Sequence, residues 1–257
     1  MKQKIDLYAF YSSPALSQEV IEAGISGLVV DWEFGEKERR QNLYNTQINR
    51  HGEQELREAR QLTDRPIICR INGGDHWTED QTRLAMDLGA DCILLPMVKS
   101  LGEVEQLLRV ADGKVQVGIM IETLEAVELA SQIGRMPIDK AYVGLNDLSI
   151  ARKSHNIFTP LIDGTLDEIR PHFSCDFGVA GLTHPELGNP IPSRLLLQYM
   201  DYLQVSFTFL RRSFYRDMHQ YTAQEMIQAI HNSRNPQNLE NDLFELKRHI
   251  LEATMLI

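Results

Sequence analysis

Two carboxylates and one amide directly follow two short apolar stretches in the middle of the chain. Glu122 comes after the run 117–121, and Asn146 and Asp147 come after the run 141–145. Apolar side chains at helical spacing lie between the runs, so the segment predicts a strand, a helix and a second strand. Because the strands of such a unit are parallel, both carboxylates are expected at the same carboxyl edge of the sheet. Oxygen ligands converging there predict a hard divalent cation, Mg²⁺ or Mn²⁺, held by Glu122 and Asp147.

Each carboxylate also has a purely structural interpretation. Acidic residues are favoured in the first turn of a helix, so Glu122 and Asp147 could each simply begin the following helix. The paired placement favours the metal site.

Three more polar residues stand at the ends of predicted strands. Asp31 and Glu33 close one strand, and Arg70 lies inside the apolar run PIICRIN. A buried guanidinium must be paired, because an unpaired buried charge costs several kcal/mol. Arg70 is therefore expected either to form a salt bridge with Glu33 or Glu122, or to clamp a substrate carboxylate and stabilise an oxygen that becomes negative.

The elements that must position these residues form a repeating pattern. Eight short apolar runs alternate with helical or irregular segments, which predicts one (β/α)₈ TIM-barrel domain spanning residues 1–257. Continuous apolar strands are typical of a parallel sheet covered on both faces. An open doubly wound sheet is disfavoured, because no GxGxxG turn follows the first run. The predicted strands are 5–11, 27–32, 66–72, 92–98, 117–121, 141–145, 178–183 and 205–210.

Two segments exceed this pattern. Residues 34–52 are polar and predict a long loop with one short helical turn. Residues 221–257 predict helices with a break at Asn235–Pro236. This tail is longer than a barrel requires, so it packs either on a neighbouring subunit or back over its own barrel.

Composition excludes several classes of protein. The chain has 257 residues, 43% hydrophobic and 24% charged, which suits one large globular core. The net charge of -10 argues against nucleic acid or an anionic membrane as the main partner. No segment approaches the roughly 20 apolar residues needed to span a bilayer, and the first residues lack the apolar run of a signal peptide. Three cysteines without a CxxC pair predict a reducing, cytoplasmic location.

Five short motifs together resemble the HpcH/HpaI aldolase and citrate lyase β-subunit family. They are the D-x-E ending at Glu33, the R-x-N at Arg70, the LLPMV run from Leu94, the I-E-T around Glu122 and the G-x-x-D-L-S from Gly144. The resemblance extends over roughly residues 24–210. It implies a (β/α)₈ barrel that binds a divalent cation and a 2-keto acid.

The resemblance also implies roles for individual residues. The cation would be held by Glu122 and Asp147, and Arg70 would bind the substrate. The backbone N–H groups of the Gly144-Leu145-Asn146-Asp147 loop would hold the carboxylate of pyruvate.

Further roles depend on water and on assembly. Asp31 and Glu33 would hydrogen-bond water on the metal. Asp87 stands where the family's aldolases place an acid that reaches a neighbouring subunit's site, although it is equally compatible with an exposed acid at a helix end. The resemblance implies a homo-oligomer, a trimer or hexamer built by exchanging a late helix.

One position departs from the aldolase pattern. Phe34 stands where the aldolases have a histidine base, so the identity of the base is open. His51 or a metal-bound hydroxide could replace it, although the position of His51 favours a solvated loop residue.

The resulting hypothesis is a class II-type aldolase that cleaves or forms a 2-keto acid through the enolate of pyruvate. One alternative is a citrate lyase-like or malyl/citramalyl-CoA lyase acting on a CoA thioester, with Arg39, Arg40 and Arg152 near the phosphates. A class I aldolase would need a lysine, for which Lys99 is the candidate. A non-catalytic barrel that binds metal and keto acid is the alternative of another class. The arginines of the run 206–214 could serve an interface, a phosphate or only solubility.

Overall fold

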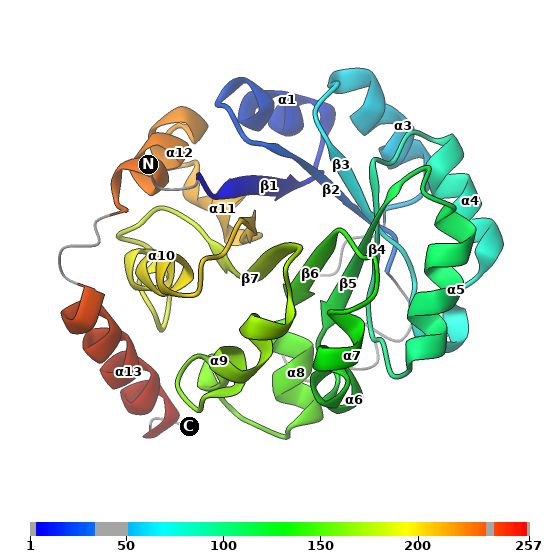
Figure 1. Ribbon diagram of the computed structural model, residues 1–257. Coiled ribbons are helices and arrows are strands. Elements are labelled where there is room, and N and C mark those ends of the chain that lie inside the picture. Colours follow the sequence, from blue (N-terminus) through cyan, green and yellow to red (C-terminus); the bar gives the residue numbers. More distant parts are fainter. Residues whose placement is uncertain (1–3, 34–50, 235–238, 256–257) are drawn as a thin grey trace.

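Eight parallel strands close into a barrel in the order of the sequence, as a computed structural model of residues 4–33, 51–234 and 239–255 shows (Figure 1). This confirms the predicted (β/α)₈ fold. The strands are β1 Asp6–Phe10, β2 Gly27–Asp31, β3 Ile67–Arg70, β4 Cys92–Leu95, β5 Gln116–Ile121, β6 Lys140–Val143, β7 Asp176–Leu182 and β8 Phe207–Leu210.

Helices surround the barrel on its outer side (Figure 1). They are α1 Pro14–Glu22, α3 Glu53–Leu62, α4 Glu79–Asp87, α5 Leu101–Ala111, α6 Leu124–Glu128, α7 Ala130–Ile133, α8 Leu145–Ala151, α9 Thr165–Ile169, α10 Ser193–Tyr202, α11 Ser213–Asp217, α12 Ala223–Asn232 and α13 Leu239–Met255. Three short 3₁₀ turns lie at Gly74–His76, Thr159–Leu161 and Arg170–His172.

The interior of the barrel is an apolar cluster separate from the larger core between strands and helices. Side chains alternate between the two faces of a strand. A residue two positions after a member of the interior cluster therefore also points inward, at the carboxyl end of the barrel. This rule turns Asp31, Arg70, Glu122 and Arg211 toward the barrel axis. The interior cluster consists of Tyr8, Val29, Ile68, Cys92, Leu94, Met120, Tyr142, Phe207 and Phe209.

Several predicted boundaries were wrong. The strand expected to reach Leu145 ends at Val143, because Leu145 is the first residue of α8 and is buried beneath it. The helix after Glu122 divides at Leu129 into α6 and α7. Most of the predicted loop 34–52 and the break at Asn235–Pro236 lie outside the described residues.

The tail packs on its own barrel through α13. Leu246 and Ile250 are buried, and α13 lies against α10. The amide of Asn156 donates to Ile250 O at 2.9 Å. The outer side of α13 leaves Phe244 and Met255 exposed, at 73% and 83%. Packing of this helix on a neighbouring subunit stays a prediction.

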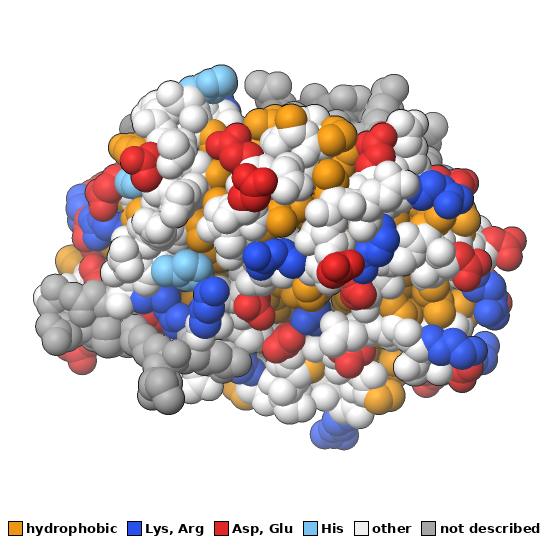
Figure 2. Space-filling view, turned by 90° about the horizontal axis from the view of Figure 1, so that it is seen from above, with side chains coloured by type: hydrophobic (Ala, Val, Ile, Leu, Met, Phe, Trp, Pro, Cys, Tyr) orange, Lys and Arg blue, Asp and Glu red, His pale blue; other side chains and the backbone are white. Residues whose placement is uncertain are grey.

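The surface carries intermingled charges. Figure 2 shows acidic and basic side chains interspersed with hydrophobic ones on the face seen from above. Within residues 4–33, 51–234 and 239–255, no helix is both long and apolar enough to cross a membrane.

Candidate active site

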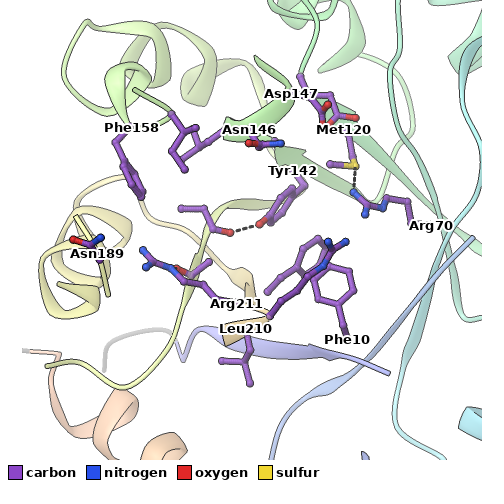
Figure 3. A pocket seen from close by; sticks show the side chains of 18 residues that line it. Phe10, Arg70, Met120, Tyr142, Asn146, Asp147, Phe158, Asn189, Leu210 and Arg211 are labelled. Atoms are coloured by element: carbon purple, nitrogen blue, oxygen red, sulfur yellow. Dashed lines mark hydrogen bonds between the residues drawn. The ribbon is translucent and has the colours of Figure 1, made fainter. Parts of the chain in front are cut away.

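A cavity of about 430 Å³ lies at the carboxyl ends of the strands (Figure 3). Five of the residues that the sequence singles out for binding line this cavity together. Its walls also include Phe10, Met120, Tyr142 and Phe209 from the barrel interior. The five site residues are Arg70, Glu122, Gly144, Asn146 and Asp147.

Arg70 is fixed by a two-bond salt bridge. Asp31 and Arg70 are partners in the register of β2 and β3. Nε of Arg70 donates to Asp31 Oδ1 at 2.9 Å and Nη2 donates to Oδ2 at 2.6 Å. Burial would lower the pKa of Arg70, but the charges of Asp31 and Glu33 reverse this and raise it. The guanidinium is therefore a permanent, oriented cation at the cavity wall.

The remaining edge of Arg70 makes only long contacts. Nη1 lies 3.4 Å from Glu33 Oε2 and 3.7 Å from the sulfur of Met120, the contact drawn in Figure 3. The sequence left Glu33 or Glu122 open as the partner of Arg70. The structure shows the ion pair with Glu33 and, in addition, the shorter two-bond salt bridge with Asp31. Asp31 and Glu33 are buried behind Arg70 and do not line the cavity.

Glu122 is a buried carboxylate with one oxygen unsatisfied. Oε1 accepts from Met97 N at 2.9 Å, whereas Oε2 has no hydrogen-bond partner among the described residues. Burial, followed by the charges of Asp147 and Glu33, raises the pKa of Glu122 to about 8. An unsatisfied buried oxygen is rare in native proteins, and it points to a ligand that completes the site.

The turn after β5 holds Glu122 in place. Thr123 caps α6 by accepting from Ala126 N at 3.0 Å, and its hydroxyl donates to Val98 O. Gly144 leaves room for the carboxylate, because a Cβ there would lie 2.3 Å from Glu122 Oε2. Only glycine fits at position 144, because the carboxylate of Glu122 lies so close to its Cα. In the sequence, this glycine is the first residue of the G-x-x-D motif.

Asp147 and Asn146 stand in the first turn of α8, directly behind Gly144. The backbone N–H of Gly144 donates to Ile121 O at 3.2 Å, so it is already used in a hydrogen bond to β5. The first-turn amides at positions 145–147 lack partners within the helix. For the predicted binding of a substrate carboxylate, these three amides are the available backbone donors of the loop.

The residues present fit a hard cation. Glu122 Oε2 needs a partner, Asp147 lies close enough to raise the pKa of Glu122, and both groups are oxygen donors. Among the described residues, no group of three or more His, Cys, Asp or Glu side chains could hold a metal by itself. A cation here would therefore take its other ligands from substrate or water, as a catalytic site with open positions does.

Other candidates lie away from the cavity. Asp87 is exposed at the end of α4, which precedes β4 and so lies at the opposite end of the barrel. Lys99 is also exposed and leads into α5, its amide donating to Glu103 at 2.7 Å. Arg152 binds Asp163 and Thr165 at 3.0 and 2.7 Å. Phe34, Arg39 and Arg40 lie outside the described residues.

The expectation that His51 is a solvated loop residue was wrong. Its ring is buried, and its Nδ1 accepts from Asp31 N at 3.1 Å, so Nδ1 carries no proton in this bond. His51 lines a second hollow of about 340 Å³ that shares Phe10 and Arg212 with the main cavity. Burial follows from its contact with Asp31, a contact between distant segments that the sequence alone does not reveal.

The sequence left the role of Arg211 and Arg212 open among an interface, a phosphate and solubility, and did not assign them to the site. Both are half-buried and line the cavity. Nη2 of Arg212 lies 3.4 Å from Asp31 Oδ2. Their position directly after β8 was the available signal, because the other site residues were found at strand ends in the same way.

The fold is shared with solved structures of several enzymes. A protein of the HpcH/HpaI aldolase/citrate lyase family from Burkholderia cenocepacia is 13% identical, with a TM-score of 0.65 over 90% of this chain and 95% of the other. A citrate lyase from Burkholderia xenovorans is 13% identical, with a TM-score of 0.62 over 95% and 83%. The tryptophan synthase complex of Pyrococcus furiosus is 11% identical, with a TM-score of 0.55 over 96% and 99%.

Likeness at these identities shows a common fold. No protein-family model and no curated sequence matches this chain. The same barrel also occurs in tryptophan synthase, so the fold is compatible with several activities and the residues of the site distinguish among them.

Proposed function

We propose that this protein is a divalent-metal-dependent carbon–carbon lyase of the HpcH/HpaI aldolase and citrate lyase type. It acts on a 2-keto acid through the enolate of pyruvate. The observation that carries the proposal is the unpartnered, buried Oε2 of Glu122, which lies with Asp147 and Arg70 in one cavity. The five sequence motifs and the shared fold support the same assignment.

Glu122 and Asp147 would hold Mg²⁺ or Mn²⁺, which would act as a Lewis acid on the keto group. The amides at the start of α8 would orient the carboxylate of the 2-keto acid. Walls from Met120, Tyr142 and Phe209 lower the local polarity and so strengthen each charge interaction within the cavity.

Arg70 would stabilise the negative oxygen of the enolate. When the bond between C3 and C4 breaks, its electron pair passes into the enolate of pyruvate. A general base takes the proton of the C4 hydroxyl, and C4 becomes the carbonyl carbon of the aldehyde. Asp31 keeps the guanidinium oriented before the reaction begins, which lowers the reorganisation required in the transition state.

A neighbouring copy would complete the site. Asp87 lies at the opposite end of its own barrel, so it could act in catalysis only at the mouth of another chain. We therefore propose that the protein is a homo-oligomer. Measurement of the molar mass in solution by light scattering tests it, and a monomer would remove Asp87 from the mechanism.

Exchange of the methyl protons of pyruvate for deuterium, followed by NMR with Mg²⁺ or Mn²⁺, tests the proposal. We expect metal-dependent exchange that is lost in Glu122→Ala. The matched control is Glu105→Ala, which removes an exposed carboxylate from α5. Absence of exchange by the wild type with either metal, or exchange that persists in Glu122→Ala, would contradict the proposal. Absent exchange would favour a CoA thioester substrate.

A further inference from the structure

One motif of the sequence has no part in the proposed chemistry. The run LLPMV occupies residues 94–98, and β4 ends within it at Leu95. Each of the other four motifs supplies a residue to the cavity or to the salt bridge of Arg70. Because β4 and β5 are neighbours in the barrel (Figure 1), the turn after β4 lies beside the loop that carries Glu122.

Met97, in this turn, has an unusual backbone conformation. Its φ is 56°, in the left-handed region that glycine and asparagine adopt more readily than other residues. Where another residue is held in this region, its surroundings impose the conformation, often at a functional site. The side chain of Met97 is half-buried and is not among the described residues that line the cavity. Its backbone is therefore the part that can act on the site.

The left-handed conformation directs the backbone N–H of Met97 toward Glu122. This N–H donates to Glu122 Oε1 at 2.9 Å, and Oε2 is left as the oxygen without a partner among the described residues. The next residue continues the contact, because Val98 O accepts from the hydroxyl of Thr123. Two successive residues after β4 thus hold two successive residues after β5.

Close packing on the other side of the turn limits its movement. Gly73, in the loop after β3, lies so close that an added Cβ would be 2.2 Å from Pro96 O. Pro96 is buried, and its ring restricts its own φ. The turn is therefore enclosed between the loops after β3 and β5. A change of backbone conformation at Met97 would have to move its N–H away from Glu122.

We propose that Met97 is a positioning residue for the metal site and acts through its left-handed backbone rather than its side chain. Its N–H fixes one oxygen of Glu122 and so presents Oε2 to the cation. The inference rests on the proposed function, because it takes Glu122 as a metal ligand. Position 97 then requires a residue that tolerates a positive φ, whatever its side chain.

Variants that separate the backbone from the side chain test this role. Met97→Asn and Met97→Gly replace the side chain but allow the left-handed conformation, so both should retain most of the Mn²⁺ affinity. Met97→Val disfavours that conformation, because valine is branched at Cβ. We expect it to lower Mn²⁺ affinity by about 10- to 100-fold, as the loss of a contact to a metal ligand does. Titration of Mn²⁺ followed by electron paramagnetic resonance measures the affinity.

Gln204→Val is the matched control. Gln204 also has a positive φ, of 54°, but it precedes β8 at the amino end of the barrel. The same substitution there should lower the melting temperature in EDTA and leave Mn²⁺ affinity unchanged. A general effect of backbone strain would instead lower the affinity in Gln204→Val and Met97→Val alike, which would overturn the inference.

The side-chain variant decides the matter even if Met97→Val does not fold. A loss of affinity of about 10-fold or more in Met97→Asn would overturn the inference, because it would assign the effect to the side chain. Wild-type affinity in a folded Met97→Val would also overturn it. A wild type that binds no Mn²⁺ refutes the proposed function, whereas binding that is equal in the wild type and Met97→Val refutes only the role of Met97.

Discussion

The two ends of the barrel bury charge in different ways. At the amino end, Lys140 begins β6 and Asp176 begins β7. Nζ of Lys140 lies 2.7 Å from Asp176 Oδ2 and 5.2 Å from the centre of the Phe207 ring. Lys140 is buried, but Asp176 stays half-exposed to solvent. The amino-end pair is thus satisfied by the protein and by water.

At the carboxyl end of the barrel, two charged side chains each have a buried polar atom without a hydrogen-bond partner among the described residues. Glu122 Oε2 and Arg211 Nη2 are buried without hydrogen-bond partners in the described chain. Polar groups left in this state cost stability, and proteins retain them where a ligand completes the site. The comparison teaches that burial alone does not mark a functional charge; at the carboxyl end, the charged groups with an unused atom also line one cavity.

Removing Arg70 should give the largest effect. Arg70→Met leaves the fully buried Asp31 without its main partner, so we expect the free energy of unfolding to fall by about 3 kcal/mol. Pyruvate exchange should fall by about 100- to 1000-fold. Urea denaturation and NMR exchange measure the two quantities. The double variant Arg70→Met/Asp31→Asn should recover part of the stability, and an unchanged stability of Arg70→Met would contradict the paired site.

Filling Gly144 should weaken the metal site without straining the backbone. Its φ of -84° is ordinary for alanine, but the added Cβ would lie 2.3 Å from Glu122 Oε2. We expect Gly144→Ala to lower Mn²⁺ affinity by about 10- to 100-fold, as other changes beside metal ligands do. Gly102→Ala is the control, since no atom lies within 3.4 Å of its added Cβ. Unaltered affinity in Gly144→Ala would show that Glu122 is not a ligand.

The pH dependence of stability should differ between the metal-free and metal-bound protein. The pKa of Glu122 is about 8 in the folded chain and ordinary, near 4.5, in the unfolded chain. Between pH 4.5 and pH 8, Glu122 is protonated in the folded chain and ionised in the unfolded chain. The free energy of unfolding should therefore fall as the pH rises from about 4.5 to 8.

Melting temperatures in EDTA, compared between wild type and Glu122→Gln, measure this contribution. The fall should be smaller in Glu122→Gln, and added Mn²⁺ should reduce it in the wild type. Parallel pH profiles for the two proteins in EDTA would be inconsistent with a raised pKa.

A change at the amino end should have the smallest effect. Lys140→Met replaces a buried cation with an apolar chain of similar length, and the half-exposed Asp176 can turn to water. We expect the free energy of unfolding to change by less than about 1 kcal/mol. Pyruvate exchange should not change. A large loss of exchange would show that the ends of the barrel are coupled, which would break the comparison.

Much of the fold follows from sequence, because short apolar runs alternate regularly with helical patterns. The same regularity placed Glu122, Asp147 and Arg70 at one end of the barrel. The pairing of Arg70 with Asp31 depends on the register of β2 and β3, which the sequence does not state. Arg211 was noted in the sequence but not assigned to the site, because the rule that found polar residues at strand ends was not extended to β8.

Boundaries were less predictable where one residue suits two elements. Leu145 is apolar and continues the pattern of β6, yet it begins α8, because burial beneath a helix also requires an apolar side chain. His51 was misjudged because its burial depends on contacts with Tyr11 and Asp31, which come from distant parts of the sequence.

Mn²⁺ binding tests the central claim most directly. Free Mn²⁺ is followed by electron paramagnetic resonance during titration at pH 9, above the raised pKa of Glu122. The account predicts one saturable site per chain in the wild type, strongly weakened binding in Glu122→Gln, and wild-type binding in Asp176→Asn at the amino end. Equal binding by wild type and Glu122→Gln, or no binding by the wild type, would contradict it.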